Sequence, residues 1–138
     1  MTISSDEGTK PLHALQPAQL LATEPDNSVW LSASAGSGKT QVLTARVIRL
    51  LLAGARPDEI LCLTFTKAAA AEMEERINRI LAGWVQLPND LLFNDLEALG
   101  APSGPEGRNS ARELFAQVLD APGGGLQIMT IHSFCQSL

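Results

Sequence analysis

This chain of 138 residues has few cysteines, no excess of positive charge and no long apolar run. Its two cysteines, Cys62 and Cys135, lie far apart and form no CxxC pair or Cys/His cluster, which argues against a zinc or iron–sulfur centre. So few cysteines indicate a reducing, disulfide-free setting, and we expect a cytoplasmic protein. Cys62 lies inside an apolar run and is expected to be a small core residue.

Basic residues are outnumbered by acidic ones. The 10 Lys and Arg against 15 Asp and Glu give a formal net charge of −5, which argues against a broadly basic surface that coats nucleic acid. A local groove that holds bases by stacking remains compatible with this charge. No apolar run approaches the length of a membrane span, and residues 1–10 lack the apolar segment of a signal peptide.

The remaining features are those of one α/β domain. A hydrophobic content of 45% supports a core without disulfides or a structural metal. Residues 1–12 are expected to form a disordered tail, and residues 13–138 the domain. Strand-like runs at 28–33, 60–65 and 126–130 alternate with helix-like segments, which predicts parallel strands joined by right-handed crossovers.

Helical patterns recur along the chain. They predict helices at residues 12–22, 39–53, 67–84, 110–119 and 132–138. In the third of these, Trp84 falls on the apolar face, so it is expected in the core and not as a stacking platform. Residues 86–109 contain repeated Pro and Gly and are expected to be a loop-rich insertion, with short helical pieces near 90–99.

The strand at 60–65 is almost wholly apolar and is expected to be buried on both faces.

The most informative motif is residues 33–40, Ala-Ser-Ala-Gly-Ser-Gly-Lys-Thr, between a predicted strand and a predicted helix. Its glycines let backbone N–H groups approach phosphate oxygens, and the following helix presents its N-terminus to the same anion. Lys39 is expected to reach the β- and γ-phosphates, and the Thr40 hydroxyl suits a ligand of Mg²⁺. The motif predicts a nucleotide-binding P-loop; the alternative is a Gly-rich turn with an incidental lysine. Ala33 in place of the usual first Gly is a small departure.

Two further segments follow predicted strands, as the P-loop does. The carboxyl ends of parallel strands meet at one edge of a sheet, so residues 33–40, 64–66 and 130–132 are expected at the same edge. Residues 64–66 read Thr-Phe-Thr, which offers hydroxyls to phosphate or sugar and a ring to a base. Taken alone, Phe65 fits the core more readily than a stacking platform. His132 alone fits a core or capping position.

Together these segments resemble the start of a superfamily 1 DNA helicase of the UvrD/RecB type, and within it the AddA-type helicase–nuclease subunits of double-strand-break repair. Residues 32–40 resemble the first helicase motif. Residues 63–73 resemble the second block, which contacts single-stranded DNA, and residues 130–135 resemble the third block, also near DNA. The resemblance spans nearly the whole chain.

The resemblance implies roles for individual residues. Lys39 and Thr40 would act in catalysis, with Thr40 as the Mg²⁺ ligand. The residues that would bind the nucleotide are Gln19, Ala33, Ser34, Ala35, Gly36, Ser37, Gly38, Lys39, Thr40 and Gln41. Those that would contact DNA are Thr64, Phe65, Thr66, Thr130 and His132. Gln19 lies where the family has its adenine-reading glutamine, and Gln16 is its rival; an amide can both donate to and accept from adenine. Many relatives carry Arg or Lys at the position of Gln41, so this chain departs from the family pattern there.

The resemblance also implies a fold and an activity. The fold would be that of a P-loop NTPase, with a RecA-like parallel sheet flanked by helices, here an incomplete first motor domain. The activity would be ATP-dependent unwinding of DNA in double-strand-break repair. ATP and Mg²⁺ would be the cofactors, single strands and duplex ends the DNA substrates, and an AddB-like protein the partner.

Hydrolysis in this family needs an Asp-Glu pair at the carboxyl end of a strand. The pairs at 6–7 and 58–59 do not lie at such an end. We therefore expect an N-terminal fragment that binds ATP and does not hydrolyse it appreciably alone. Three alternatives remain open: a plain UvrD-like repair helicase, another P-loop enzyme such as a small-molecule kinase, and a non-catalytic nucleotide-binding module.

Overall fold

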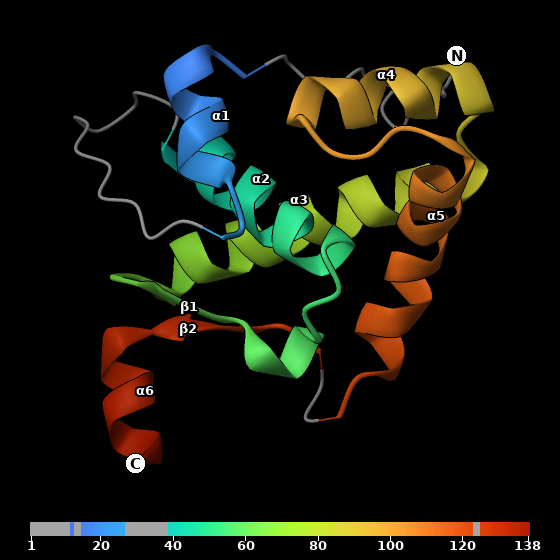
Figure 1. Ribbon diagram of the computed structural model, residues 1–138. Coiled ribbons are helices and arrows are strands. Elements are labelled where there is room, and N and C mark those ends of the chain that lie inside the picture. Colours follow the sequence, from blue (N-terminus) through green and yellow to red (C-terminus); the bar gives the residue numbers. More distant parts are fainter. Residues whose placement is uncertain (1–11, 13–14, 27–38, 123–124) are drawn as a thin grey trace, which may run out of the picture.

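The computed structural model describes residues 12, 15–26, 39–122 and 125–138, which combine helices with a short parallel sheet (Figure 1). The elements in chain order are α1 (Pro17–Thr23), α2 (Lys39–Leu52), the 3-10 helix η2 (Pro57–Glu59), β1 (Leu61–Thr64), α3 (Lys67–Gln86), α4 (Asn89–Leu99), α5 (Pro105–Asp120), β2 (Gln127–Thr130) and α6 (Ile131–Ser137). In the described part of the chain, no helix is long and apolar enough to cross a membrane.

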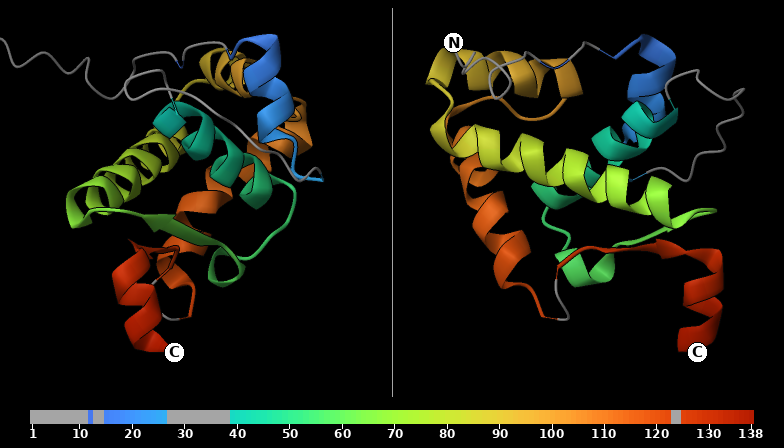
Figure 2. Two further views of the ribbon diagram at one scale, coloured as in Figure 1. Left: turned by 90° about the vertical axis from the view of Figure 1, so that its left-hand side faces the viewer. Right: turned by 180° about the vertical axis from the view of Figure 1, so that it is seen from behind.

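The sheet of the described residues consists of β1 and β2, paired in parallel as the alternation of strands and helices predicted. The register joins Leu61 to Gln127 at one end and Thr64 to Thr130 at the other. A parallel pair needs a crossover, and here the crossover contains α3, α4 and α5. α3 lies on one side of the sheet and α6 extends on the other (Figures 1 and 2).

Only one face of β1 is covered, so the expected burial of this strand on both faces is wrong. Cys62 and Ile128 share a face of the sheet and pack against the core, whereas Leu61 and Leu63, on the opposite face, are exposed. The place of Cys62 against the core is confirmed. Burial raises the pKa of its thiol, so Cys62 is protonated and unreactive at neutral pH.

α3 follows the predicted periodicity closely. Thr66 precedes it as the N-cap, and its side-chain oxygen accepts the backbone N–H of Ala69 at 3.1 Å, which satisfies one of the helix's orphan donors. The apolar positions that predicted the helix are all buried: Met73, Ile77, Leu81 and Trp84. The core position of Trp84 is therefore confirmed.

Residues 86–109 are mostly helical: the helical structure expected near 90–99 is confirmed by α4, whereas the expectation of a loop-rich segment is wrong. They hold α4 and the start of α5, and several of their prolines and glycines mark helix ends. Pro88 is the N-cap of α4, and Pro105 occupies the first turn of α5. Gly100, at a φ of 70°, ends α4 in the left-handed conformation that glycine adopts without strain. That this segment is an insertion stays a prediction.

The N-terminal expectations are met in part. α1 starts at Pro17 and not at residue 12, since proline suits the first turn of a helix, where its missing N–H costs nothing. Leu12, the last residue of the predicted tail, packs against the core. The rest of that tail and the predicted strand at 28–33 lie outside the described residues.

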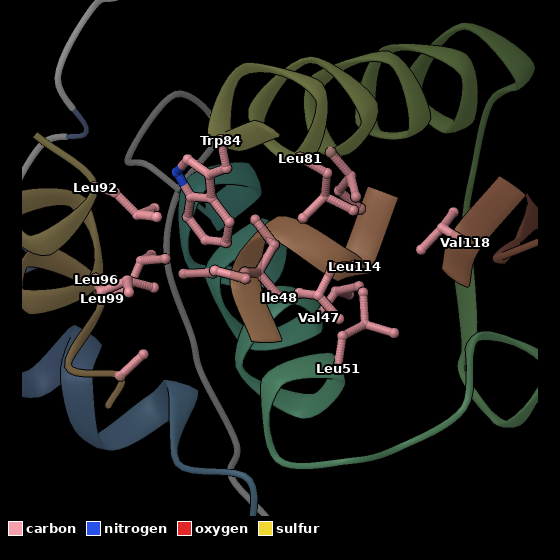
Figure 3. Close-up of a cluster of buried hydrophobic side chains, with 14 of the residues drawn as sticks. Val47, Ile48, Leu51, Leu81, Trp84, Leu92, Leu96, Leu99, Leu114 and Val118 are labelled. Carbon is pink, nitrogen blue, oxygen red and sulfur yellow. The ribbon is translucent and has the colours of Figure 1, made fainter. Parts of the chain in front are cut away.

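The core lies between α2, α3, α4 and α5 (Figure 3). Trp84 of α3 is 1% exposed, and Ile48 of α2 and Leu92 of α4 are fully buried beside it. The Trp84 indole N–H donates to Asp95 Oδ2 at 3.0 Å, and the Leu12 N–H donates to Asp95 Oδ1 at 3.2 Å. Burial of an aromatic ring of this size typically stabilises a fold by about 3–5 kcal/mol relative to alanine.

Arg112 of α5 binds the end of α3 and the start of α4, next to the core around Trp84. Its guanidinium donates to the Trp84 and Leu87 carbonyls, both at 2.8 Å, and to Asn89 Oδ1 at 2.7 Å. The last carbonyls of a helix have no partner within that helix. Arg112 supplies partners at the end of α3 and so joins α3, α4 and α5.

We predict that Asp95→Ala lowers the free energy of unfolding by about 1–3 kcal/mol, because it leaves the buried Trp84 indole N–H without an acceptor. Asn94→Ala, at an exposed neighbour on α4, is the control and should change it by less than about 0.5 kcal/mol. Urea denaturation measures both. An effect of Asp95→Ala no larger than that of Asn94→Ala would show that the bonds from Trp84 and Leu12 to Asp95 contribute nothing to stability.

Candidate functional site

The carboxyl ends of β1 and β2 meet, because Thr64 pairs with Thr130. Both strands run toward the side of the molecule on which α2 begins, in Figure 1 and again in the right-hand view of Figure 2. The prediction that residues 64–66 and 130–132 share one edge is confirmed. The third predicted segment is described only from Lys39 onward; residues 33–38 lie outside the described residues.

Phe65 stands between two threonines whose hydroxyls shape the turn. Thr64 Oγ1 donates to the Thr66 carbonyl at 3.0 Å, while Thr66 Oγ1 caps α3. The Phe65 ring is 92% exposed, so the core position considered for it is wrong. An exposed ring on a hydrogen-bonded turn offers a face for stacking with little loss of backbone freedom.

Thr130, which pairs with Thr64 across the sheet, has a structural role at the end of β2. Its hydroxyl oxygen accepts the Ser133 N–H at 3.1 Å and the hydroxyl donates to Ser133 Oγ at 2.9 Å, which caps α6. Thr130 is buried, and its side chain orients the turn instead of facing solvent. His132, in the first turn of α6, is exposed. The core position considered for His132 is therefore wrong, and its imidazole is open to a ligand.

The start of α2 is suited to an anion. This helix of 14 residues has no acidic side chain in its first turn, so no carboxylate of that turn offsets the positive end of the helix dipole. Thr40 is exposed and Gln41 is half-buried. An exposed hydroxyl at this position fits the role of a Mg²⁺ ligand.

Gln19 lies on α1, where its side chain is anchored. Its Oε1 accepts the backbone N–H of Gln16 at 2.9 Å. This bond orients the amide, leaves the NH₂ group to donate, and leaves Oε1 a second lone pair with which to accept. Adenine offers one acceptor and one donor on the corresponding edge. Gln16 is exposed at the helix start, and its backbone supports the Gln19 side chain.

Two arginines of α2 hold α1 in place, and the sequence analysis missed them. Arg46 donates to the Ala22 carbonyl at 2.8 Å. Arg49 donates to Thr23 Oγ1 at 2.7 Å and forms an ion pair with Glu24 at 2.8 Å. A signal was present, since Arg49 interrupts an apolar run and a buried cation requires partners. Its partners are 25 or more residues away and have no local pattern.

The acidic pair Asp58–Glu59 lies in η2, at the amino end of β1, where both side chains form ion pairs with Arg56. This agrees with the expectation that the pair does not serve as the hydrolytic carboxylates. No cluster of acidic, His or Cys side chains able to hold a metal ion occurs among the described residues.

Comparison with known proteins gives one family. Residues 15–138 match the UvrD/REP helicase N-terminal domain. The chain is 38% identical over 120 residues to an ATP-dependent helicase/nuclease subunit of Latilactobacillus sakei, which covers 86% of the chain and 11% of that protein. It is 38% identical over 121 residues to the protein of the same name from Clostridium beijerinckii, or 85% of the chain and 8% of the relative.

The identity is higher over a shorter stretch. The protein of the same name from Levilactobacillus brevis is 62% identical over 55 residues, which are 40% of the chain and 4% of the relative. The chain therefore spans about a tenth of the length of its curated relatives or less. No solved structure matches it significantly. Because the match to the UvrD/REP model covers residues 15–138, the chain belongs to the UvrD/REP helicase N-terminal domain family.

Proposed function

We propose that this chain binds ATP and single-stranded DNA as the N-terminal part of the first motor domain of an ATP-dependent DNA helicase. The observation that carries the proposal is the shared edge of β1 and β2, where the exposed Phe65 and His132 follow paired strand ends. The fold would be that of a P-loop NTPase with a RecA-like sheet, of which β1 and β2 are a part.

The nucleotide site combines a base end and a phosphate end. Gln19 reads adenine through its anchored amide, and residues 33–38 are the proposed phosphate-binding motif. Lys39 binds the β- and γ-phosphates, Thr40 holds Mg²⁺, and Gln41 borders the base. The start of α2, without acidic residues in its first turn, supports this assignment. Bound Mg²⁺ would neutralise charge on the phosphates, which is the chemistry that phosphoryl transfer requires.

The DNA site is a short stacking track. Phe65 stacks on a base, and such stacking tolerates any sequence, which suits a motor that steps along arbitrary DNA. Thr64 and Thr66 hold the turn that carries the ring, and they bring this turn to phosphate or sugar. His132 contacts the DNA backbone, and Thr130 positions it through the cap of α6.

The names of the relatives support a larger assignment. Each of these relatives is named as one subunit of an ATP-dependent helicase/nuclease, which implies a second subunit and nuclease activity in that assembly. We infer that the protein containing this chain is such a helicase–nuclease subunit. It would act on single strands and duplex ends in double-strand-break repair, and would assemble with an AddB-like partner.

We predict that Lys39→Ala weakens ATP binding by about 1.5–3 kcal/mol, because a charge-assisted bond to phosphate is lost. Isothermal titration calorimetry on the full chain measures this. Lys67→Ala, which removes an exposed lysine at the start of α3, is the matched control and should leave ATP binding unchanged. Undiminished binding in Lys39→Ala would remove Lys39 from the site.

We predict that Phe65→Ala weakens binding of single-stranded oligonucleotides by about 1–3 kcal/mol, since one stacking contact is lost. ATP affinity and the free energy of unfolding should stay nearly unchanged, because the ring is 92% exposed. Phe93→Ala, at a partly exposed ring on α4, is the control for fluorescence anisotropy. A loss of stability with unchanged DNA binding would return Phe65 to a structural role.

A further inference from the structure

Arg49 occupies a junction of three helices. Its guanidinium donates to the Leu20 carbonyl at 3.2 Å, to Thr23 Oγ1 at 2.7 Å and to Glu24 Oε1 at 2.8 Å. These acceptors lie in the middle of α1, at its last residue and at the residue after it. Arg49 is 9% exposed, and a buried cation with all its partners on one neighbouring helix fixes that helix closely.

The end of α4 closes the junction. A Cβ atom placed on Gly100 would lie 3.0 Å from Leu20 Cδ2 and 3.6 Å from Arg49 Nη1, so α4 approaches both residues closely at its glycine cap. Arg46 adds bonds from α2 to the Ala22 and Glu24 carbonyls at 2.8 and 3.1 Å. In the part of the chain that the structure describes, Arg46 and Arg49 supply the hydrogen bonds that join α1 to α2.

The position of Gln19 depends on this junction. α1 has only 7 residues, and a helix so short is marginal without tertiary contacts. Leu20, whose carbonyl Arg49 binds, is the residue next to Gln19. α2, which carries Arg49, begins at Lys39. One rigid helix therefore connects the proposed phosphate end of the nucleotide site to the support of the proposed base end.

We propose that Arg49 is a positioning residue for nucleotide selection: it holds α1 against α2 so that the Gln19 amide meets adenine while the triphosphate lies at the start of α2. The inference rests on the proposed function, because it assumes that Gln19 reads the base. In this proposal Arg49 contributes to the preference for adenine over other bases and does not contribute to phosphate binding.

The test compares three ligands on the full chain: ATP, GTP and tripolyphosphate, which has no base. Arg49→Met keeps the length of the side chain and removes its donors. We expect the preference for ATP over GTP to fall at least about fivefold, close to the fall in Gln19→Ala, while tripolyphosphate affinity changes less than about twofold. Arg49→Lys should give an intermediate preference, because lysine keeps the charge and loses the fork of two nitrogens. Arg76→Met, at a surface arginine paired with Glu72, is the control and should change nothing.

Each outcome decides between the claims. An unchanged ATP preference in folded Arg49→Met, with loss of preference in Gln19→Ala, overturns the role of Arg49 and leaves nucleotide binding intact. An unchanged preference for ATP over GTP in Gln19→Ala also overturns the inference, because it shows that Gln19 does not read the base. No binding of ATP or tripolyphosphate by the unaltered chain contradicts the proposed function itself. If Arg49→Met does not fold, Glu24→Ala is the deciding variant, because it removes only the half-exposed partner of Arg49. We then expect the preference for ATP over GTP to fall at least about twofold. An unchanged preference for ATP in Glu24→Ala would overturn the inference.

Discussion

Parallel pairing of β1 with β2 is the constraint on which the described structure depends. It forces a long crossover, and the same register that pairs Thr64 with Thr130 delivers two turns to one edge. At each turn a threonine caps the following helix, Thr66 for α3 and Thr130 for α6. A helix therefore begins almost directly after each strand ends. Each start leaves a ring side chain, Phe65 or His132, exposed at that edge.

The crossover keeps its place through polar bonds made inside the core. Asp95 accepts from the Trp84 indole and from Leu12, so a single buried carboxylate ties α4 to α3 and to the segment before α1. Arg112 supplies donors to the carbonyls at the end of α3. On the other side, Arg49 ties α1 to α2. The base end and the phosphate end of the proposed nucleotide site thereby share a support that is part of the core.

Strong periodicity made much of this fold predictable. The helix with Trp84 on its apolar face followed from the periodicity within one segment, and the parallel pairing of the strands followed from the alternation of strands and helices along the chain. At 86–109 the helical structure near 90–99 was expected, but the loop-rich character was not found, because Pro and Gly at 88, 100 and 105 lie at the ends of helices. The sequence analysis missed Arg49, since the partners of a buried cation are distant in sequence. The exposed face of β1 was missed because an apolar sequence shows that a strand can be buried, but does not show which of its two faces other elements cover.

The central claim is that the shared edge of β1 and β2 holds single-stranded DNA. Photo-crosslinking of the full chain to an oligonucleotide that carries 5-iododeoxyuridine tests it most directly, because iodouracil couples to aromatic rings stacked against it. Peptide mapping by mass spectrometry should place the main crosslink at Phe65, with any second one at His132. Crosslinks confined to α4 or α5, far from that edge in Figure 1, would contradict the account.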